Sequence, residues 1–554
     1  MKNYTFKILT ALVGGLFLLA SCQDLDVTNP NNPDTERALA SASDVEALVG
    51  SQYQQWWNTQ KNYPAMTLSV MSNASTASWG NFGMFDLGAF PRQAFLNDPS
   101  YSDIGMSTVI WSNAYTAISS VNDGLNAIEA GITFESQNEM RRQRMEAFSR
   151  FIQGISYGLL ANHYDQGFII DENTDLEGVA LGNVELEMVD YQELLATAVG
   201  FLDDAISLAN SSSFTLPEGW ISGNALTSGE LAQLAEAYKV RFITSNARSV
   251  AERDAINWTA IRDMTDNVMD ASFFDNSEDA FTVQADGVFW WSRLHSLMQE
   301  PGWVRTDMML IGRTDESGQF EPYANGPVLE REQFILTTSD RRVAGQEDVF
   351  NDENEQTGEA QRTSPGTDFA HIGPAPHPSA RGEWRWSRYA HHRNDEMYRN
   401  GYVGPMQHMR VTEMKMMHAE ALLRLNEPVI LPAVVDLINE TRVDRGGLDP
   451  MLVTDSFDDV WNAMRYEFEI ETHATAAGLD YYHTRSCGNL RGENYGKLLE
   501  GTPIHFPVPA GELMLLELPI YTFGGSEGGA APKGIPSDYM EAIKLGNQLD
   551  VTVE

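Results

Sequence analysis

Apolar side chains recur at helical spacing through most of the first half of the chain. Segments with this period run over residues 44–57, 109–130, 141–163, 190–209, 228–245 and 254–269. The first contains Ser43-Asp44-Val45-Glu46, a capping-box pattern in which Ser43 accepts from a free amide and Glu46 reaches back. The pattern predicts a helical N-terminal part over residues 35–270.

The helical period returns near the other end of the chain. There it is carried by Val411, Met414, Met417, Ala421 or Leu422, and Leu425. A break at Pro428 precedes Pro432, which suits a helix start, and a second helix over 433–445 should end at Gly446. The two helices form a hairpin of roughly the tetratricopeptide repeat length, about 34 residues, although the consensus signature of that repeat is not visible.

The residue composition and the hydrophobic pattern change over residues 271–404. Glycine, proline, histidine and aromatic residues become frequent there, and the helical period fades. A long irregular region inside a compact protein is usually functional. We therefore expect an insert lobe at 271–404, packed against a helical scaffold that residues 405–554 complete.

The start of the chain has the order of a secretory signal peptide. Lys2 and Lys7 precede an apolar run at 8–20, which is shorter than the roughly 20 residues that span a bilayer. Leu19-Ala20-Ser21-Cys22 resembles a bacterial lipobox, so we expect a signal peptide at 1–21, a lipidated Cys22 and a polar leader at 22–34. Two acyl chains would anchor the protein stably to a membrane. The alternative is that Cys22 is an ordinary residue of a cleaved signal.

Charge and cysteine content narrow the class of protein further. The chain of 554 residues carries 78 acidic and 37 basic residues, a net charge of −41. Nucleic acid is therefore not an expected partner, because phosphate binding requires a basic surface. The acidity suits surface solvation, and a saline habitat is one hypothesis for it. With Cys22 acylated, Cys487 has no partner in the chain and should be a buried, inert thiol.

Aromatic residues in the irregular stretches are the candidate ligand-binding residues. Flat apolar rings beside polar groups are what a carbohydrate site requires. The candidates are Trp79, Phe82, Trp291, Trp303, Trp384 and Trp386. Taken singly, each ring is more often a core residue than a ligand contact. In a strand, Trp290 and Trp291 would point in opposite directions, so at most one would face a ligand.

The sequence gives only weak support for a metal site or for a catalytic nucleophile. Methionine and histidine crowd residues 397–418, but most of the methionines fall on or beside an apolar helix face, so no metal or other cofactor is expected. His391-His392 reads as a polar loop pair. Gly-x-Ser-x-Gly surrounds Ser156, inside a predicted helix, and Ser526, in a glycine-rich loop, and neither offers the strand-to-helix turn of a nucleophile. We therefore predict a protein that is not an enzyme.

Several motifs resemble the SusD/RagB family of surface lipoproteins. They are Arg410 to Arg424 with Glu413 and Ala419-Glu420, then Asn439 to Gly447 with Arg442 and Arg445-Gly446, the Trp111 to Asn122 segment, Glu146 to Tyr164, and Phe506 to Leu513. One block departs from the family pattern, because Cys487 stands where tryptophan is usual.

The resemblance implies a fold, a location and a partner. The fold is a mainly α, α-α superhelix of four tetratricopeptide-like helix pairs with a large irregular insert lobe. The resemblance implies a lipoprotein on the outside of the cell outer membrane that binds a nutrient, a glycan or in some branches an oligopeptide. Its partner would be a SusC-like, TonB-dependent β-barrel transporter, and no catalysis is implied. A tetratricopeptide-type scaffold that binds a protein or peptide remains the alternative, and a secreted hydrolase the third.

Overall fold

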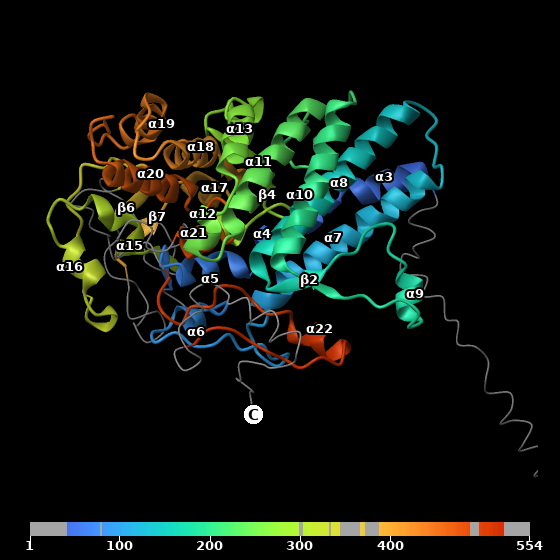
Figure 1. Cartoon of the computed structure of the whole chain (residues 1–554), viewed down its shortest axis with the longest axis horizontal. Coiled ribbons are helices and arrows are strands. Elements are labelled where there is room, and N and C mark those ends of the chain that lie inside the picture. The colour runs from blue at the N-terminus through green and yellow to red at the C-terminus, as the bar shows by residue number, and fades with distance from the viewer. Residues whose placement is uncertain are drawn as a thin grey trace, which may run out of the picture.

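Long helices from both halves of the chain stand side by side in one layer (Figure 1). The structure is a computed structural model that describes residues 41–61, 63–77, 80–298, 303–331, 334–343, 366–371, 387–487 and 498–525. The N-terminal helices are α3 (Ala42–Gly50), α4 (Gln52–Lys61), α5 (Pro64–Met71), α6 (Met84–Gly88), α7 (Gly105–Glu129), α8 (Asn138–His163), α9 (Leu176–Ala180), α10 (Tyr191–Asn210), α11 (Ser228–Asn246), α12 (Val250–Asp254) and α13 (Trp258–Val268). The C-terminal helices are α18 (Val411–Asn426), α19 (Pro432–Arg442), α20 (Phe457–Thr472), α21 (Leu479–Cys487) and α22 (Ala510–Leu515).

These helices pack as consecutive pairs. The pairs are α7 with α8, α10 with α11, α18 with α19, and α20 with α21, while α13 packs on α18 and joins the two halves. Close approach depends on glycine in α8, because a Cβ at Gly158 would lie 2.3 Å from the Phe242 ring and one at Gly154 would lie 2.5 Å from Leu202. The predicted α-α superhelix of tetratricopeptide-like pairs is confirmed.

The predicted start of the first helix is wrong. Ser41, not Ser43, caps α3, and its hydroxyl accepts from the Asp44 amide at 3.2 Å. The Glu46 carboxylate does not reach back to a cap, because it is held by the guanidinium groups of Arg141 and Arg144 on α8. The helix also ends at Gly50, and α4 follows as a separate helix.

Two further boundaries differ from the prediction. The helix expected over 254–269 begins later, at Trp258, since α12 ends at Asp254 and Asn257 caps α13 by accepting from the Ala260 amide. The second helix of the C-terminal hairpin begins at Pro432, as predicted, but ends at Arg442. The methionines of this region lie in the hydrophobic core as expected: Met406, Met409, Met414, Met416 and Met417.

The strands form three small sheets, and the middle of the chain adds several short helices. One antiparallel sheet has the strand order β1 (Ser75–Ala77), β5 (Val304–Thr306), β7 (Tyr389–His391) and β6 (Phe369–His371). Two-stranded sheets pair β2 (Gln166–Phe168) with β3 (Met188–Asp190), and β4 (Ala280–Asp286) with β8 (Val403–Arg410). The short helices here are α14 (Arg293–Leu297), α15 (Met308–Ile311), α16 (Phe320–Asn325), α17 (Asp395–Arg399) and the 3₁₀ turns η1 (Ser272–Phe274), η2 (Gly312–Thr314) and η3 (Val328–Glu330).

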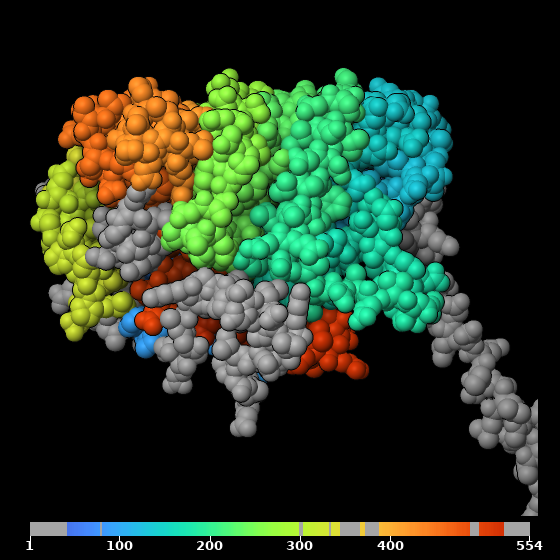
Figure 2. All heavy atoms as spheres, viewed as in Figure 1, coloured from blue at the N-terminus to red at the C-terminus, as the bar shows by residue number. Residues whose placement is uncertain are grey.

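Segments from the two ends of the chain lie side by side beneath the helical layer. Figure 2 shows the C-terminal segment in red under the helices. The Phe95 amide donates to the Phe523 carbonyl at 3.0 Å, and the Asn97 side chain donates to the Val508 carbonyl at 3.0 Å. The chain thus closes on itself at this face.

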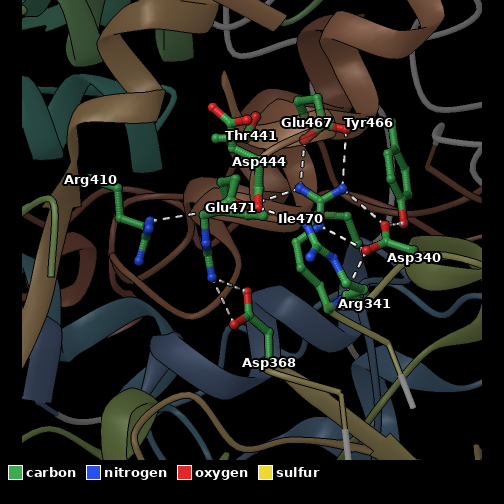
Figure 3. A network of polar contacts seen from close by, with 12 residues as sticks. Asp340, Arg341, Asp368, Arg410, Thr441, Asp444, Tyr466, Glu467, Ile470 and Glu471 are labelled. Atoms are coloured by element: carbon green, nitrogen blue, oxygen red, sulfur yellow. Dashed lines mark hydrogen bonds and ion pairs between the residues drawn. The ribbon is translucent and has the colours of Figure 1, made fainter. Parts of the chain in front are cut away.

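A buried charge network joins the middle segment to α20 (Figure 3). The Arg342 guanidinium lies 2.9 Å from both Asp340 and Glu471 and also binds Glu467. On the other side of Glu471, Arg445 bridges to Asp368, which Arg393 also binds, and Arg410 lies 3.3 Å from Glu471. The four arginines match four carboxylates, so the network carries no net charge.

The structure also tests three smaller predictions, which concern Cys487, Ser156 and His391. Cys487 is buried as expected, and burial raises the pKa of its thiol, so it stays protonated and inert. Ser156 lies inside α8. His391 is not a loop residue: it is a buried part of β7 and packs on Phe369.

Within the described ranges, no helix is long and apolar enough to cross a membrane.

Candidate functional site

Five side chains from four segments stack in a row that we call the cation–aromatic ladder. In order they are Lys61, Trp291, Arg293, Phe82 and Trp303. The Lys61 ammonium lies 4.7 Å from the centre of the Trp291 ring, and the Arg293 guanidinium lies 5.2 Å from that ring and 4.8 Å from the Phe82 ring. Phe82 and Trp303 stack with their centres 5.6 Å apart and their planes 18° apart. Cations and rings therefore alternate along the first four positions.

Local hydrogen bonds hold the segments that carry the ladder. Lys61 is the last residue of α4, and the indole N–H of Trp57, one turn earlier, donates to the Trp291 carbonyl at 3.0 Å. The Lys61 ammonium also donates to the Phe289 carbonyl at 3.3 Å. These bonds fix the turn after β4 against the end of α4.

The backbone at Phe82 is in the left-handed region, with φ of +61°. That conformation is rare for a bulky residue and costs of order 1–3 kcal/mol. The Thr67 hydroxyl holds it by donating to the Phe82 carbonyl at 2.6 Å, and the Tyr63 ring packs edge-on against Phe82. Such strain persists where the surroundings fix a side chain for a purpose, which marks Phe82 as a functional candidate.

The ladder has an inner and an outer side. On the inner side, Phe82 and Trp303 pack on a small apolar cluster that includes Met84, Leu294 and Val304. All five ladder residues are only half-buried. Val288 and Phe289, just before Trp291, are 65% and 66% exposed. The result is a partly apolar surface that a ligand can reach.

The two cations of the ladder lie in an environment that disfavours charge. Burial lowers the pKa of Lys61, which Asp286 raises and the neighbouring Arg293 charge lowers again. Burial also lowers the pKa of Arg293. Asp286 is itself engaged, because one of its oxygens accepts three backbone N–H groups at 2.8 Å, from residues 288, 289 and 290. The surface therefore holds two close positive charges.

The structure brings three of the predicted site residues together. Phe82, Trp291 and Trp303 all belong to the ladder. Trp290 is buried beside Tyr53 and Trp291 is half-buried, but the pair follows β4 rather than lying in a strand, so the alternation expected of a strand does not apply. The remaining predicted residues lie outside the described ranges: Cys22, Trp79, Trp384 and Trp386.

Sequence reasoning missed the cations. Arg293 stands two positions after Trp291 inside a stretch already chosen for its aromatics, and that spacing was a usable signal. Lys61 carried no local signal, because it meets Trp291 only through the packing of α4 against the segment after β4. Tyr63, which buttresses Phe82, was likewise missed.

Two other concave regions deserve comparison with the ladder. A groove of about 500 Å³ is lined by Trp111, Tyr115 and Phe168, with Leu176 of α9 and Glu512 of α22 at its edges. A cleft of about 520 Å³ lies beside Trp258 and Trp461, but Arg424 lies over both rings, at 4.6 and 5.0 Å. The groove is lined by apolar rings together with the hydroxyls of Ser112, Thr116, Ser119 and Ser120, and no cation is among its lining residues.

The described residues offer little for metal or hydrolytic chemistry. Among them no group of three or more His, Cys, Asp or Glu could hold a metal ion. Burial raises the pKa of Asp165 to about 7, but that carboxylate is enclosed and accepts from the Tyr521 hydroxyl at 2.8 Å. Asp165 therefore has a structural partner rather than access to a substrate. Ser526 lies outside the described ranges.

Comparison with known proteins identifies solved structures that share this fold. No family model matches the sequence, and no curated protein matches it either. Solved structures do match. A surface glycan-binding protein A from Bacteroides uniformis has a TM-score of 0.54 at 14% identity, over 86% of this chain and 98% of that one.

Two more solved structures agree. A SusD-like carbohydrate-binding protein from Bacteroides fragilis has a TM-score of 0.52 at 14% identity, over 81% of this chain and 86% of that one. A SusD superfamily protein from Parabacteroides distasonis has a TM-score of 0.52 at 15% identity, over 85% of this chain and 97% of that one. The helix pairs with their inserted sheet thus define a tetratricopeptide-like superhelix. More particularly, the chain has the fold of SusD-like proteins, as the sequence motifs predicted.

Proposed function

We propose that this protein is a surface lipoprotein of the cell outer membrane that binds a nutrient glycan without transforming it. A SusC-like, TonB-dependent transporter then takes up the glycan. The single observation that carries the binding role is the cation–aromatic ladder, a half-buried row of rings and cations on a SusD-like fold. Sugar C–H faces pack on such rings, and the cations orient hydroxyl or acidic groups.

The names of the similar structures support the ligand class. Two of them are described as a surface glycan-binding protein and a SusD-like carbohydrate-binding protein. The predicted site residues that lie outside the described ranges, Trp79, Trp384 and Trp386, remain part of the proposal, as does the lipid anchor at Cys22.

An apolar surface next to the Trp111 groove supports a protein partner. Leu515 of α22 is 80% exposed and Met514 is 58% exposed, and Leu176 and Leu181 at α9 are 50% and 68% exposed. Leu176 of α9 and Glu512 of α22 both line the Trp111 groove, so these exposed apolar side chains belong to the two helices at its edges, and exposed apolar patches mark protein contacts. We assign this surface to the rim of the transporter.

Retention on immobilised glycans tests the binding role. Wild-type protein should be retarded by at least one member of a broad polysaccharide panel. Trp303→Ala and Trp291→Ala should weaken that affinity by about tenfold, as expected when a central aromatic contact of about 1–2 kcal/mol is removed. Phe201→Ala is the matched control, because Phe201 of α10 is a half-buried ring that lies under Arg150 of α8. Equal loss in the control, or no loss in either ladder variant, would remove the ladder from the site.

A further inference from the structure

The Trp111 groove combines hydroxyl groups on α7 with apolar side chains on the segment after α8. Ser112, Thr116 and Ser119 are spaced four and three residues apart, so they lie on one face of α7. The apolar wall consists of Phe168, Ile170 and Leu176. The groove therefore suits a ligand that offers both hydrogen-bonding groups and apolar side chains, as a polypeptide segment does.

Tyrosine hydroxyls hold the apolar wall in place. The Tyr115 hydroxyl accepts from the Phe168 amide at 2.7 Å and donates to the Phe168 carbonyl at 2.9 Å. The Tyr157 hydroxyl makes the same two bonds with Ile170, both at 2.7 Å. The wall is thus formed before any ligand binds, which lowers the cost of ordering it on binding.

Two carboxylates at the groove lie without a cation. Glu512 of α22 lines the groove, and Asp123 continues the hydroxyl face of α7, four residues after Ser119. Among the described residues, no hydrogen bond or ion pair engages either carboxylate. Burial raises the pKa of Asp123, and no cation of the described chain opposes that shift. A cation brought by a ligand would therefore stabilise the charged carboxylate.

The segments that build the groove carry acidic residues and no basic ones. Lysine and arginine are absent from α7, from residues 166–190 and from residues 510–520, although aspartate or glutamate occurs in each. The Arg150 guanidinium on α8 is already bound to Glu172 at 2.6 Å. Charge complementarity therefore requires positive charge on the molecule that covers the groove.

We propose that the Trp111 groove binds a segment of the transporter in which basic residues flank apolar ones. The apolar side chains fill the groove, and lysine or arginine pairs with Glu512 and Asp123. The charge of Glu512 acts on Tyr115, and Tyr115 precedes Asp123 by eight residues of α7, a span of roughly 12 Å along the helix. An extended chain covers that span in about four residues, so the basic residues should lie about three to five positions apart.

This inference rests on the proposed function and deepens it by naming the chemistry of the contact with the transporter. The apolar rims favour a protein segment over a second glycan site. Leu176 and Leu181 are exposed at one rim, and Leu515 is exposed at the other. A glycan in the groove would leave these leucines in water and both carboxylates without a cation.

The salt resistance of the complex tests the role of the two carboxylates. The full-length protein is isolated with its transporter from gently solubilised outer membranes and washed with increasing salt, which screens ion pairs. The Asp123→Asn, Glu512→Gln double variant should lose half of its transporter at a lower salt concentration than the wild type.

The charge-matched control is the Asp436→Asn, Asp449→Asn double variant. Both residues are exposed, Asp436 on α19 and Asp449 after it, and α19 lies far from α9 (Figure 1). This control should match the wild type. Equal salt resistance of all three proteins overturns the proposed pairing.

Cross-linking identifies the segment that occupies the groove. A photo-cross-linking amino acid in place of Thr116, an exposed residue of the α7 wall, is activated in intact cells, and the attached peptide is identified by mass spectrometry. The expected peptide belongs to the transporter and has basic residues at the stated spacing on either side of apolar ones. A transporter peptide without those basic residues, or a peptide of another protein, overturns the inference.

The outcomes separate this inference from the function on which it rests. Thr116→Trp should obstruct the groove, reduce recovery of the transporter and leave retention on glycans unchanged. Lost glycan retention with full transporter recovery would make the groove a glycan site, and no change in either would remove it from both roles; each result overturns the inference and leaves the transporter complex intact. Absence of any transporter with the wild type overturns both the inference and the uptake role.

Discussion

At the scale of single residues, the site depends on side chains placed against their local preferences. Phe82 adopts a left-handed backbone conformation, which is strained for a bulky residue, and burial lowers the pKa of Arg293 and of Lys61. The sequence shows neither feature. The sequence did indicate the aromatic stretches, because tryptophan and phenylalanine are concentrated in irregular segments. It did not indicate contacts such as that of Lys61 with Trp291, because these join residues far apart in the chain.

Asp165 is a buried residue with a measurable effect on stability. Burial raises its pKa from an ordinary 3.8 to about 7, against the lowering effect of the Tyr521 hydroxyl. Between these two pH values the folded protein binds one more proton than the unfolded chain at this site. Its contribution to the free energy of unfolding therefore falls as pH rises through that window.

Asp165→Asn should remove this contribution. In urea unfolding, the variant should match the wild type near the acidic end of the window and become relatively more stable toward neutral pH. Taking the difference between the two proteins cancels the opposite effect of buried histidines such as His295, whose pKa burial lowers to about 4. The control is Glu177→Gln at an exposed position of α9. A difference that stays constant with pH would contradict the account.

At the scale of elements, the buried charge network attaches the middle segment to α20. Arg342 is fully buried and contacts Asp340, Glu467 and Glu471. Breaking such a pair leaves carboxylates buried without their cation, which is far more costly than losing an exposed ion pair.

Arg342→Met should accordingly reduce the free energy of unfolding by about 3–5 kcal/mol. Arg399→Met, which removes an exposed pair with Asp395 on α17, should cost less than about 0.5 kcal/mol. Chemical denaturation of both variants checks the contrast, and similar small losses in both would show that the network does not hold the segment.

The helices were largely predictable, and their ends were not. The apolar period located α7, α8, α10, α11 and α18 to within a few residues, because each buries one continuous face. The start of α3 was wrong since Ser41 and Ser43 are both suitable caps, and only the engagement of Glu46 by α8 decides between them. The strands of the middle segment gave no periodic signal, because most contain only three residues.

The exposed apolar surface at α22 gives a second test at this scale. Leu515→Asp should reduce recovery of the transporter with this protein and leave the melting temperature unchanged, because Leu515 is 80% exposed. Leu452→Asp, at a 53% exposed position before α20, is the matched control and should leave recovery unchanged. Equal recovery with Leu515→Asp would remove α22 from the proposed contact.

At the scale of the whole molecule, the proposed function combines a lipid anchor, a helical scaffold and a ligand-binding surface. The polar leader at 22–34 would hold the helical body away from the membrane, and the net charge of −41 keeps that body solvated. In the proposed function, the location at the outer membrane depends on lipidation of Cys22.

Cys22→Ser should release the body from the membrane fraction. Cys487→Ser is the control, because Cys487 is the other cysteine of the chain and is buried in α21. Fractionation of cells that express each variant gives the result. Retention of Cys22→Ser in the membrane fraction would show that another segment anchors the protein.

Recovery of partners from gently solubilised outer membranes tests the central claim most directly. The protein would be isolated through a C-terminal tag, and its companions identified by mass spectrometry. The account predicts a large β-barrel transporter in near-equal amount. Recovery of the protein alone, or with a soluble protein in place of a transporter, would contradict the uptake role and favour a scaffold that binds a protein partner.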